Sequence, residues 1–266
     1  MSKVISVVSY SGGVGKTTLC LMLTYILSEN QNNKILVIDV DGQEDVSHLI
    51  KKTFKNEIEP NNTIITGIKN FDLAETIMPI TKNIHLIHGD WNIEYFDTYL
   101  VNNYEEKAHY YLLYTLLKDI KKEYDYIIFD TSPQTASITN NAIVASDYVI
   151  IPTEATEKGV RRTKHTYEYL SSLTDYNEQL QLIGIVPYYL KDRDSNSRIH
   201  LKQLKDIFEE DVFHNIIKST RKVPTWWREG ITTKKGNDKK ILKMYANIVD
   251  EIIMRIEKIE ERKENV

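Results

Sequence analysis

A glycine-rich segment near the N-terminus, SGGVGKTT at residues 11–18, separates a strand-like apolar run from a helical pattern. Glycines allow the backbone to curl so that successive N–H groups face inward, and the start of the following helix adds its dipole. The segment therefore predicts a loop that binds the phosphates of a nucleotide. The residues expected to form this loop are Ser11, Gly12, Gly13, Val14, Gly15, Lys16, Thr17 and Thr18.

Within this loop, two side chains have specific expected roles. Lys16 is expected to reach the β- and γ-phosphates and so to act in catalysis, and Thr17 offers a hydroxyl to Mg²⁺. Gly-Lys-Thr at a strand–helix junction is a specific signal, because both the residues and their context are those of a phosphate site.

Six short apolar runs, rich in Val, Ile and Tyr, predict buried strands, and the segments between them have helical patterns. The runs are 4–9, 34–39, 83–89, 124–130, 147–153 and 182–189, and the helical segments are 16–29, 105–121, 135–145, 155–172, 195–210 and about 237–263. Near-continuous apolarity is typical of parallel strands that are covered on both faces. We therefore expect a doubly wound, mostly parallel α/β sheet with helices on both faces. No Pro/Gly-rich linker interrupts the pattern, so residues 1–266 are expected to form one domain, with the amphipathic final helix packed on it.

Carboxylates follow two of these runs, where ligands bind in open α/β sheets. Asp39 and Asp41 end one run, and Asp130 ends another. We expect Asp39 and Asp130 to join Thr17 around Mg²⁺, and Asp41 to position the attacking water in phosphoryl transfer. Asp39 and Asp41 are thus both catalytic candidates, although Asp41 could instead cap a helix at residues 44–54.

Composition and charge narrow the class of protein. Apolar residues make up 41% and charged residues 27% of the 266 residues, as in ordinary globular proteins. No apolar stretch is long enough to span a membrane, the N-terminus lacks the pattern of a signal peptide, and Cys20 is the only cysteine. These features predict a cytoplasmic protein with no membrane association.

The distribution of charge is uneven although the net charge is only −4. Residues 191–243 hold 14 Lys and Arg against 8 Asp and Glu. Such an asymmetry favours a face that contacts phosphate backbones, but a solvated basic surface would give the same count.

The sequence resembles ParA-type partition ATPases of the broader MinD/ParA group with a deviant Walker A loop. SGGVGKTT (11–18) resembles the family's KGGxGKTT loop, and VIDVDGQEDVS (37–47) resembles its DxDPQ segment with Gly42 in place of proline. YDYIIFDTSPQ (124–134) with the strand after it resembles the family's DTPP segment, and STRKVPTWWREG (219–230) weakly resembles its basic C-terminal loop.

This resemblance implies binding of ATP and ADP with Mg²⁺, and a homodimer that forms face to face when ATP binds. It also implies non-specific DNA binding in the nucleoid, and a ParB-like centromere-binding partner that stimulates hydrolysis and release. Arg221 and Lys222 fall in the family's basic segment, and Arg198 lies on a predicted helix with Lys202 and Lys205 on the same face. Pro187 and Tyr188, at the end of the sixth run, are expected to border the adenine.

One position departs from the family pattern. Relatives carry a lysine before the paired glycines, and it reaches the phosphates of the other subunit, but this chain has Ser11. Three explanations remain open. Another basic residue or the partner protein supplies the charge, or the protein binds ATP and cycles very slowly as a DNA-binding switch, or Ser11 is an engineered replacement. A MinD-like positioning ATPase is a further alternative for the whole chain.

Overall fold

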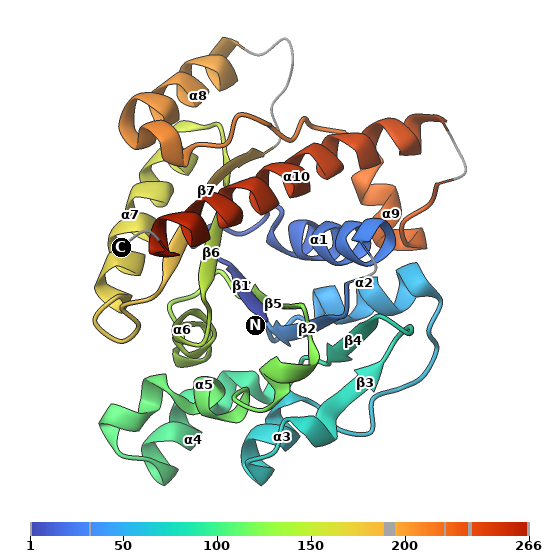
Figure 1. The fold of residues 1–266 in the computed structure, drawn as a ribbon, viewed down its shortest axis with the longest axis vertical. Coiled ribbons are helices and arrows are strands. Elements are labelled where there is room, and N and C mark those ends of the chain that lie inside the picture. Colours follow the sequence, from blue (N-terminus) through green and yellow to red (C-terminus); the bar gives the residue numbers. More distant parts are fainter. Residues whose placement is uncertain (1, 32, 189–194, 221, 234–235, 265–266) are drawn as a thin grey trace.

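Seven strands form one sheet in the order β3-β4-β2-β5-β1-β6-β7 in the computed structural model of the chain, which describes residues 2–31, 33–188, 195–220, 222–233 and 236–264 (Figure 1). The strands are β1 (Lys3–Val7), β2 (Ile35–Val40), β3 (Ile77–Pro79), β4 (Ile84–Ile87), β5 (Tyr126–Thr131), β6 (Tyr148–Glu154) and β7 (Gln181–Tyr188). All neighbours pair in parallel except β3, which runs antiparallel to β4 at one edge. The expected doubly wound, mostly parallel sheet is confirmed.

Helices cover both faces of this sheet, as Figure 1 shows. The helices are α1 (Lys16–Gln31), α2 (Asp45–Phe54), α3 (Ile64–Asn70), α4 (Phe96–Asn103), α5 (Leu112–Leu116), α6 (Ser137–Val144), α7 (Glu157–Leu173), α8 (Ser195–Phe208), α9 (Val223–Glu229) and α10 (Gly236–Glu264). Short 3-10 segments lie at Ala74–Thr76, Trp91–Tyr95, Glu106–Tyr110, Ile120–Glu123 and Glu209–Asp211.

The two apolar layers follow the alternation of side chains along each strand. On β1, Ile5 and Val7 join a cluster with residues of α1, α2, α9 and α10, whereas Val4 joins a second cluster with residues of α3, α4, α5 and α6. The core strands are buried on both sides, which explains why the sequence shows continuous apolar runs rather than strict alternation.

The C-terminal helix α10 lies along one face of the molecule (Figure 1). Ile241, Tyr245, Ile248 and Ile252 are buried in the cluster that contains α1. Apolar residues three and four apart face the core because they share one side of the helix. None of the helices, over the residues described, is both long enough and apolar enough to cross a membrane.

The predicted helix at residues 105–121 is wrong in detail. The segment instead contains the 3-10 turn Glu106–Tyr110, the short helix α5 and part of a second 3-10 turn. The side-chain amide of Asn141 on α6 donates to the carbonyl of His109, and the Asn141 Oδ1 accepts from the N–H of Leu113. These contacts take up backbone groups of the segment and favour short turns over one continuous helix.

Candidate nucleotide site

The glycine-rich loop lies at the carboxyl end of β1 and leads directly into α1. Gly13 has a φ of 76° and Gly15 a φ of 91°, a left-handed region that glycine enters without steric cost. A Cβ on Gly15 would overlap the ring of Tyr188, so the loop packs against β7 at that point. Glycine at position 15 is therefore required twice, by its backbone conformation and by this close approach.

Lys16 is held inside the curl of the loop. Its ammonium donates to the carbonyl of Ser9 at 3.2 Å and to the carbonyl of Ser11 at 3.3 Å, and only 7% of the residue is exposed. Burial lowers the pKa of Lys16, although the carboxylates of Asp130 and Asp41 oppose the shift. The sequence predicts that this ammonium binds phosphate oxygens. In the structure it binds two backbone carbonyl oxygens of the loop region instead.

Asp39 and Asp130 stand next to one another on adjacent parallel strands, because β2 and β5 pair with these two residues in register. Both are fully buried. Burial raises the pKa of Asp130 to about 7, and burial together with the neighbouring Asp130 raises the pKa of Asp39. Two carboxylates placed this close need a cation or a proton between them and the loop.

The side chain of Asp130 has an acceptor oxygen that the protein leaves unused. Its Oδ2 atom is buried and has no hydrogen-bond partner, while its side chain also interacts with the hydroxyl of Thr17. Hydroxyl and carboxylate oxygens are the ligands Mg²⁺ prefers, usually one or two of them together with phosphates and waters. Thr17 and Asp130 therefore fit Mg²⁺, and within the described ranges no group of three or more His, Cys, Asp or Glu forms a separate metal cage.

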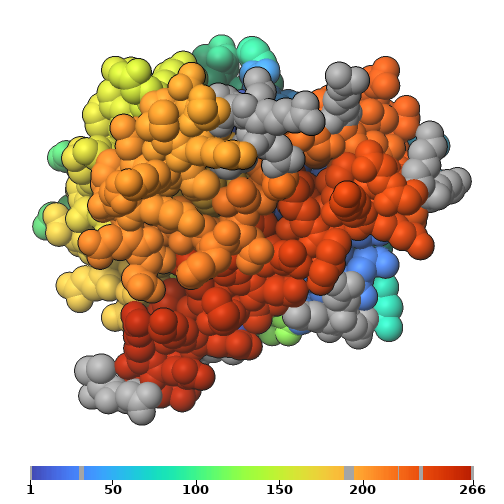
Figure 2. Space-filling model, turned by 90° about the horizontal axis from the view of Figure 1, so that it is seen from above, coloured from blue at the N-terminus to red at the C-terminus, as the bar shows by residue number. Residues whose placement is uncertain are grey.

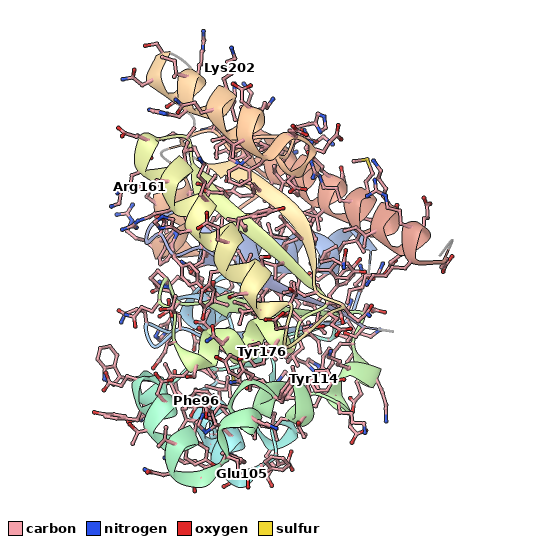
Figure 3. All side chains as sticks on the ribbon, turned by 90° about the vertical axis from the view of Figure 1, so that its left-hand side faces the viewer. Phe96, Glu105, Tyr114, Arg161, Tyr176 and Lys202 are labelled. Atoms are coloured by element: carbon pink, nitrogen blue, oxygen red, sulfur yellow. The ribbon has the colours of Figure 1, made fainter. Side chains whose placement is uncertain are left out.

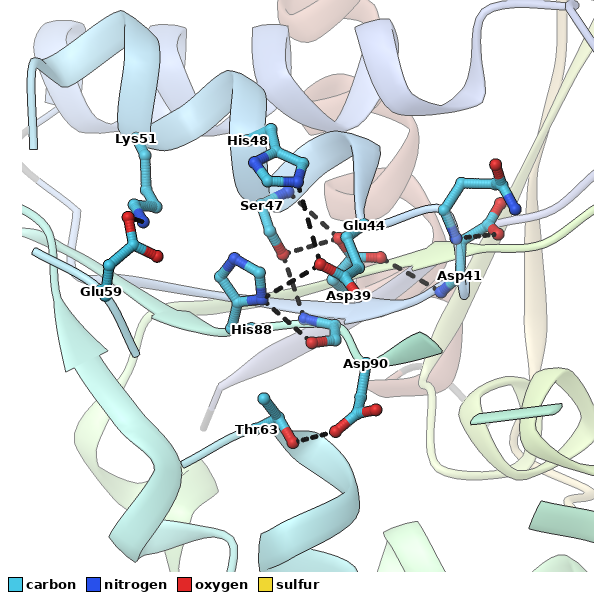
Figure 4. Close-up of polar contacts among 12 residues, drawn as sticks. Asp39, Asp41, Glu44, Ser47, His48, Lys51, Glu59, Thr63, His88 and Asp90 are labelled. Atoms are coloured by element: carbon cyan, nitrogen blue, oxygen red, sulfur yellow. Dashed lines mark hydrogen bonds and ion pairs between the residues drawn. The ribbon is translucent and has the colours of Figure 1, made fainter. Parts of the chain in front are cut away.

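Asp39 is engaged by the segment that follows it (Figure 4). It accepts from the N–H of Asp41 at 3.1 Å, and from the N–H and hydroxyl of Ser47 at 3.1 and 2.6 Å. Ser47 in turn accepts from the N–H of Gly89, which ties α2 to the end of β4. Asp39 thus anchors residues 41–47 in this structure, and its expected place in the magnesium shell stays a prediction.

Glu44 completes this network at the start of α2. It has a left-handed backbone, and its Oε2 lies 3.8 Å from His48 Nε2 and 4.0 Å from His88 Nδ1 (Figure 4). The N-terminal cap of α2 is Glu44, so Asp41 does not cap this helix. The alternative role weighed for Asp41 is therefore excluded.

Asp41 lines a cavity of about 350 Å³ to which residues 11–18 of the glycine-rich loop do not contribute. One Oδ1 bond from the N–H of Gln43 holds its carboxylate in place, and the side chain is partly exposed. The cavity is lined by Val40, Asp41, Gly42, Gln43, Trp91, Ile93, Glu94, Asp97, Ser132, Gln134, Ala136 and Ile138. Asp41 is thus accessible to a water molecule on the solvent side of the buried pair Asp39 and Asp130.

Ser11 has a partner that the sequence did not indicate. Arg162, on the first turns of α7, donates from Nη1 to the Ser11 hydroxyl at 3.4 Å. The two residues lie 151 positions apart, and no motif links them. The order of elements gave one indication that these residues could meet, since α7 follows β6 and β6 pairs with β1.

Tyr188 differs from its expected role. Its ring is fully buried between Gly15 and α10, where its hydroxyl lies 3.4 Å from the hydroxyl of Tyr245. It supports the loop from the interior, so adenine contact through Tyr188 is not compatible with this side-chain position. The expected contact of Pro187 with adenine stays a prediction.

The residues expected to bind DNA divide into three groups. Arg221 lies outside the described residues. The ammonium of Lys222 lies 3.2 Å from the carboxylate of buried Asp238, and the Lys222 side chain is only 14% exposed. Its expected contact with DNA phosphate stays a prediction and requires this ion pair to open. Arg198, Lys202 and Lys205 are exposed on α8. Figure 2 shows the segment around α8 (orange) beside α10 (red).

A sheet of this order with a Gly-Lys-Thr loop after β1 defines a P-loop nucleotide-binding fold. Residues 2–182 match the family described as AAA domain, and the chain belongs to this family of ParA- and MinD-like proteins.

Individual relatives agree with this assignment. An uncharacterised protein of Methanocaldococcus jannaschii is 30% identical over 234 residues, covering 85% of this chain and 88% of its own. The maintenance of carboxysome distribution protein A of Gloeothece citriformis is 28% identical over 228 residues, covering 82% of this chain and 85% of its own.

Solved structures extend the similarity to the whole fold. Apo McdA of Cyanothece superposes with a TM-score of 0.83 at 25% identity, covering 95% of this chain and all of that one. A putative plasmid partition protein of Borrelia burgdorferi bound to AMPPNP gives a TM-score of 0.77 at 26% identity, covering 96% and 99%.

Proposed function

We propose that this protein is a Mg²⁺-dependent ATPase that segregates DNA, in which ATP binding forms a dimer that binds DNA and hydrolysis releases it. The observation that carries the proposal is that Lys16, Thr17 and Asp130 lie together at the carboxyl ends of the central strands. Asp41, which follows one of these strands, lines a cavity open to water. Phosphoryl transfer needs mainly positioning and charge neutralisation, and these groups supply both.

The chemistry follows from the positions of these side chains. Lys16 exchanges its two carbonyl partners for phosphate oxygens, which are stronger acceptors for an ammonium. Thr17 and Asp130 would hold Mg²⁺, which would neutralise phosphate charge. Asp41 orients the attacking water from the cavity side.

The names of relatives support a positioning role. They include a protein that maintains carboxysome distribution and a putative plasmid partition protein. For this chain we infer DNA as the cargo, a ParB-like centromere-binding protein as the partner, and a location on the nucleoid in the cytoplasm. The exposed basic residues on α8 supply the contacts to DNA phosphates.

A second candidate function is a DNA-binding switch that holds ATP with little or no hydrolysis. Ser11 favours it, since the charge that relatives place at this position is absent from the loop itself. Both candidates share the nucleotide site and differ only in turnover.

A substitution at Asp41 tests the proposed mechanism. Asp41→Asn should lower kcat about 10²–10⁴-fold, the usual contribution of a group that handles the proton of an attacking nucleophile. The affinity for ATP should change little, because the loop and Lys16 remain. Steady-state phosphate release with Mg²⁺ and calorimetric titration with ATP measure the two quantities.

The neighbouring Asp45→Asn is the matched control, since Asp45 does not line the cavity of Asp41. Equal kcat for Asp41→Asn and the unaltered chain would remove Asp41 from the mechanism. An unaltered chain that binds ATP without releasing phosphate would select the switch.

A further inference from the structure

We propose that Arg162 supplies the phosphate-neutralising charge that relatives obtain from the lysine replaced here by Ser11. This inference rests on the proposed function, because it assigns a residue to the same nucleotide site. It answers how a loop without that lysine can stabilise the charge that develops on the transferred phosphoryl group.

Ser11 joins two cationic side chains. Its hydroxyl accepts from Arg162 Nη1 at 3.4 Å, and its carbonyl accepts from Lys16 Nζ at 3.3 Å. Ser11 is only 6% exposed, so both cations are brought to the base of the loop instead of to bulk water. Arg162 therefore reaches the position from which a lysine at residue 11 would extend.

The start of α7 is fixed to the sheet, so Arg162 does not approach the loop by chance. The Thr156 hydroxyl caps α7 by accepting from the N–H of Gly159 at 3.0 Å. A Cβ on Gly159 would overlap the carbonyl of Glu154, so this glycine allows the helix to start directly against the end of β6. The Thr163 hydroxyl then donates to the Thr153 hydroxyl on β6 at 2.7 Å.

This anchoring places Arg162 beside β1, because β6 is the strand that pairs with β1. Thr163 is the next residue along the chain from Arg162 and is buried against the sheet. The helix backbone that carries the guanidinium is therefore held against β6, the strand next to β1.

In the part of the chain that the structure describes, no carboxylate forms an ion pair with the Arg162 guanidinium. The side chain is partly buried. A guanidinium in this state gains more from a phosphate than from a hydroxyl, because charged acceptors form shorter and stronger hydrogen bonds and its planar fork fits two phosphate oxygens.

The existing contact is easily exchanged. At 3.4 Å, the bond to Ser11 is longer than a usual N–H···O hydrogen bond. Ser11 thus orients the guanidinium toward the loop without competing strongly with a phosphate. The Ser11 hydroxyl accepts a hydrogen bond from Arg162, whereas the positive charge of a lysine at this position would repel the guanidinium.

Four variants test the proposal. Arg162→Ala removes the charge, and Arg162→Lys keeps it without the planar fork. Ser11→Lys with Arg162→Ala restores the family's lysine in place of the arginine. Arg161→Ala is the matched control, since Arg161 is the exposed neighbour on α7 and projects outward from it (Figure 3).

We expect Arg162→Ala to lower kcat at least about 10²-fold, as does removal of one preorganised donor to a developing negative charge. Its affinity for ADP should stay within a few-fold of the unaltered chain, because Lys16 and the loop backbone remain. Arg162→Lys should keep part of the rate, the double variant should recover it, and Arg161→Ala should match the unaltered chain.

A second readout covers a chain that turns over slowly. The preference for AMPPNP over ADP, measured by calorimetry with Mg²⁺, should fall in Arg162→Ala and return in the double variant. A purely structural role of Arg162 would lower the thermal midpoint and both affinities together, and the lysine at position 11 would not rescue them.

The outcomes separate the two proposals. If the unaltered chain binds or hydrolyses ATP, and Arg162→Ala keeps both its kcat and its preference for the triphosphate, the role of Arg162 is overturned and the proposed function stands. If the unaltered chain binds no nucleotide at all, the proposed function itself is overturned.

Discussion

Lys16 is a single residue whose burial costs folding stability and whose charge serves ligand binding. Its ammonium is buried, and its partners are two carbonyl oxygens rather than a carboxylate. Burial lowers its pKa, which means that the folded state disfavours the charged form. Such a group is retained for a ligand that restores its interactions.

The cost of burying this charge leads to a prediction for Lys16→Ala. Removing the ammonium should weaken ATP binding about 10–100-fold, since a hydrogen bond to a charged group contributes roughly 1.5–3 kcal/mol. The free energy of unfolding should not fall, because the buried charge is removed along with its penalty. Calorimetric titration with ATP and urea unfolding measure the two effects.

Lys52→Ala is a suitable control, because this lysine lies on α2 and its ammonium donates to the exposed carbonyl of Trp227. A Lys16→Ala protein that binds ATP as tightly as the control would contradict the assigned role of the loop.

Individual contacts across long sequence separations were the least predictable part of the site. The Gly-Lys-Thr loop and Asp130 could be assigned from local pattern, because strand ends and glycines have fixed consequences for the backbone. The contact between Ser11 and Arg162 and the ion pair between Lys222 and Asp238 join segments that only the folded chain brings together. The sequence therefore did not indicate that the Lys222 side chain is mostly buried in an ion pair.

At the scale of elements, several long patterns were predicted well, whereas the helix expected at 105–121 and some very short elements were not. The strand run at 124–130 and the helix at 237–263 agree closely with β5 and α10, since each buries a long apolar stripe. The edge strand β3 has three residues and ends in Pro79, and α3 and α9 have seven residues each. Elements this short depend on tertiary packing, which local sequence does not record.

Glu251 is one of the residues that connect α10 to the segment after α8. It accepts from the backbone N–H groups of His214 and Asn215, and Arg255 lies 3.0 Å from its Oε1. Although burial acts in the opposite direction, these donors hold the pKa of Glu251 below its ordinary value. The carboxylate therefore stabilises the fold when it is ionised.

We expect Glu251→Gln to lower the free energy of unfolding at pH 7 by about 1–3 kcal/mol, because backbone donors and Arg255 lose a charged acceptor. The stabilisation by the native carboxylate is present above its unfolded pKa of 4.5 and is lost as pH falls through its lower folded pKa. Urea unfolding at pH 7 and at successive values below pH 4.5 should show the two proteins converging.

Glu257→Gln, on the same helix, controls for a change of charge on α10. The interpretation fails if the difference between Glu251→Gln and the unaltered protein is independent of pH.

At the scale of the whole molecule, the basic residues on α8 lie away from the acidic cavity of Asp41, and Figure 3 shows Lys202 projecting from the outer side of α8. A protein with a net charge of −4 can bind DNA if one face carries the basic groups. The position of this face on one helix follows from the spacing of Arg198, Lys202 and Lys205 at one side of it.

Substituting Lys202 and Lys205 together by Ala should weaken DNA binding equally for all sequences. Each lost phosphate contact should reduce the slope of log K against log salt by about 1. Fluorescence anisotropy with two unrelated duplexes at several salt concentrations measures this, and ATP turnover without DNA should be unchanged. Unchanged salt slopes would place the DNA interface on another face.

The most direct test of the account measures DNA binding by the unaltered chain with no nucleotide, with ADP and with ATP, each with Mg²⁺ at two salt concentrations. The account predicts binding that requires ATP, is independent of DNA sequence and weakens steeply as salt increases. Equal DNA binding in all three nucleotide states, or none in any of them, would contradict it.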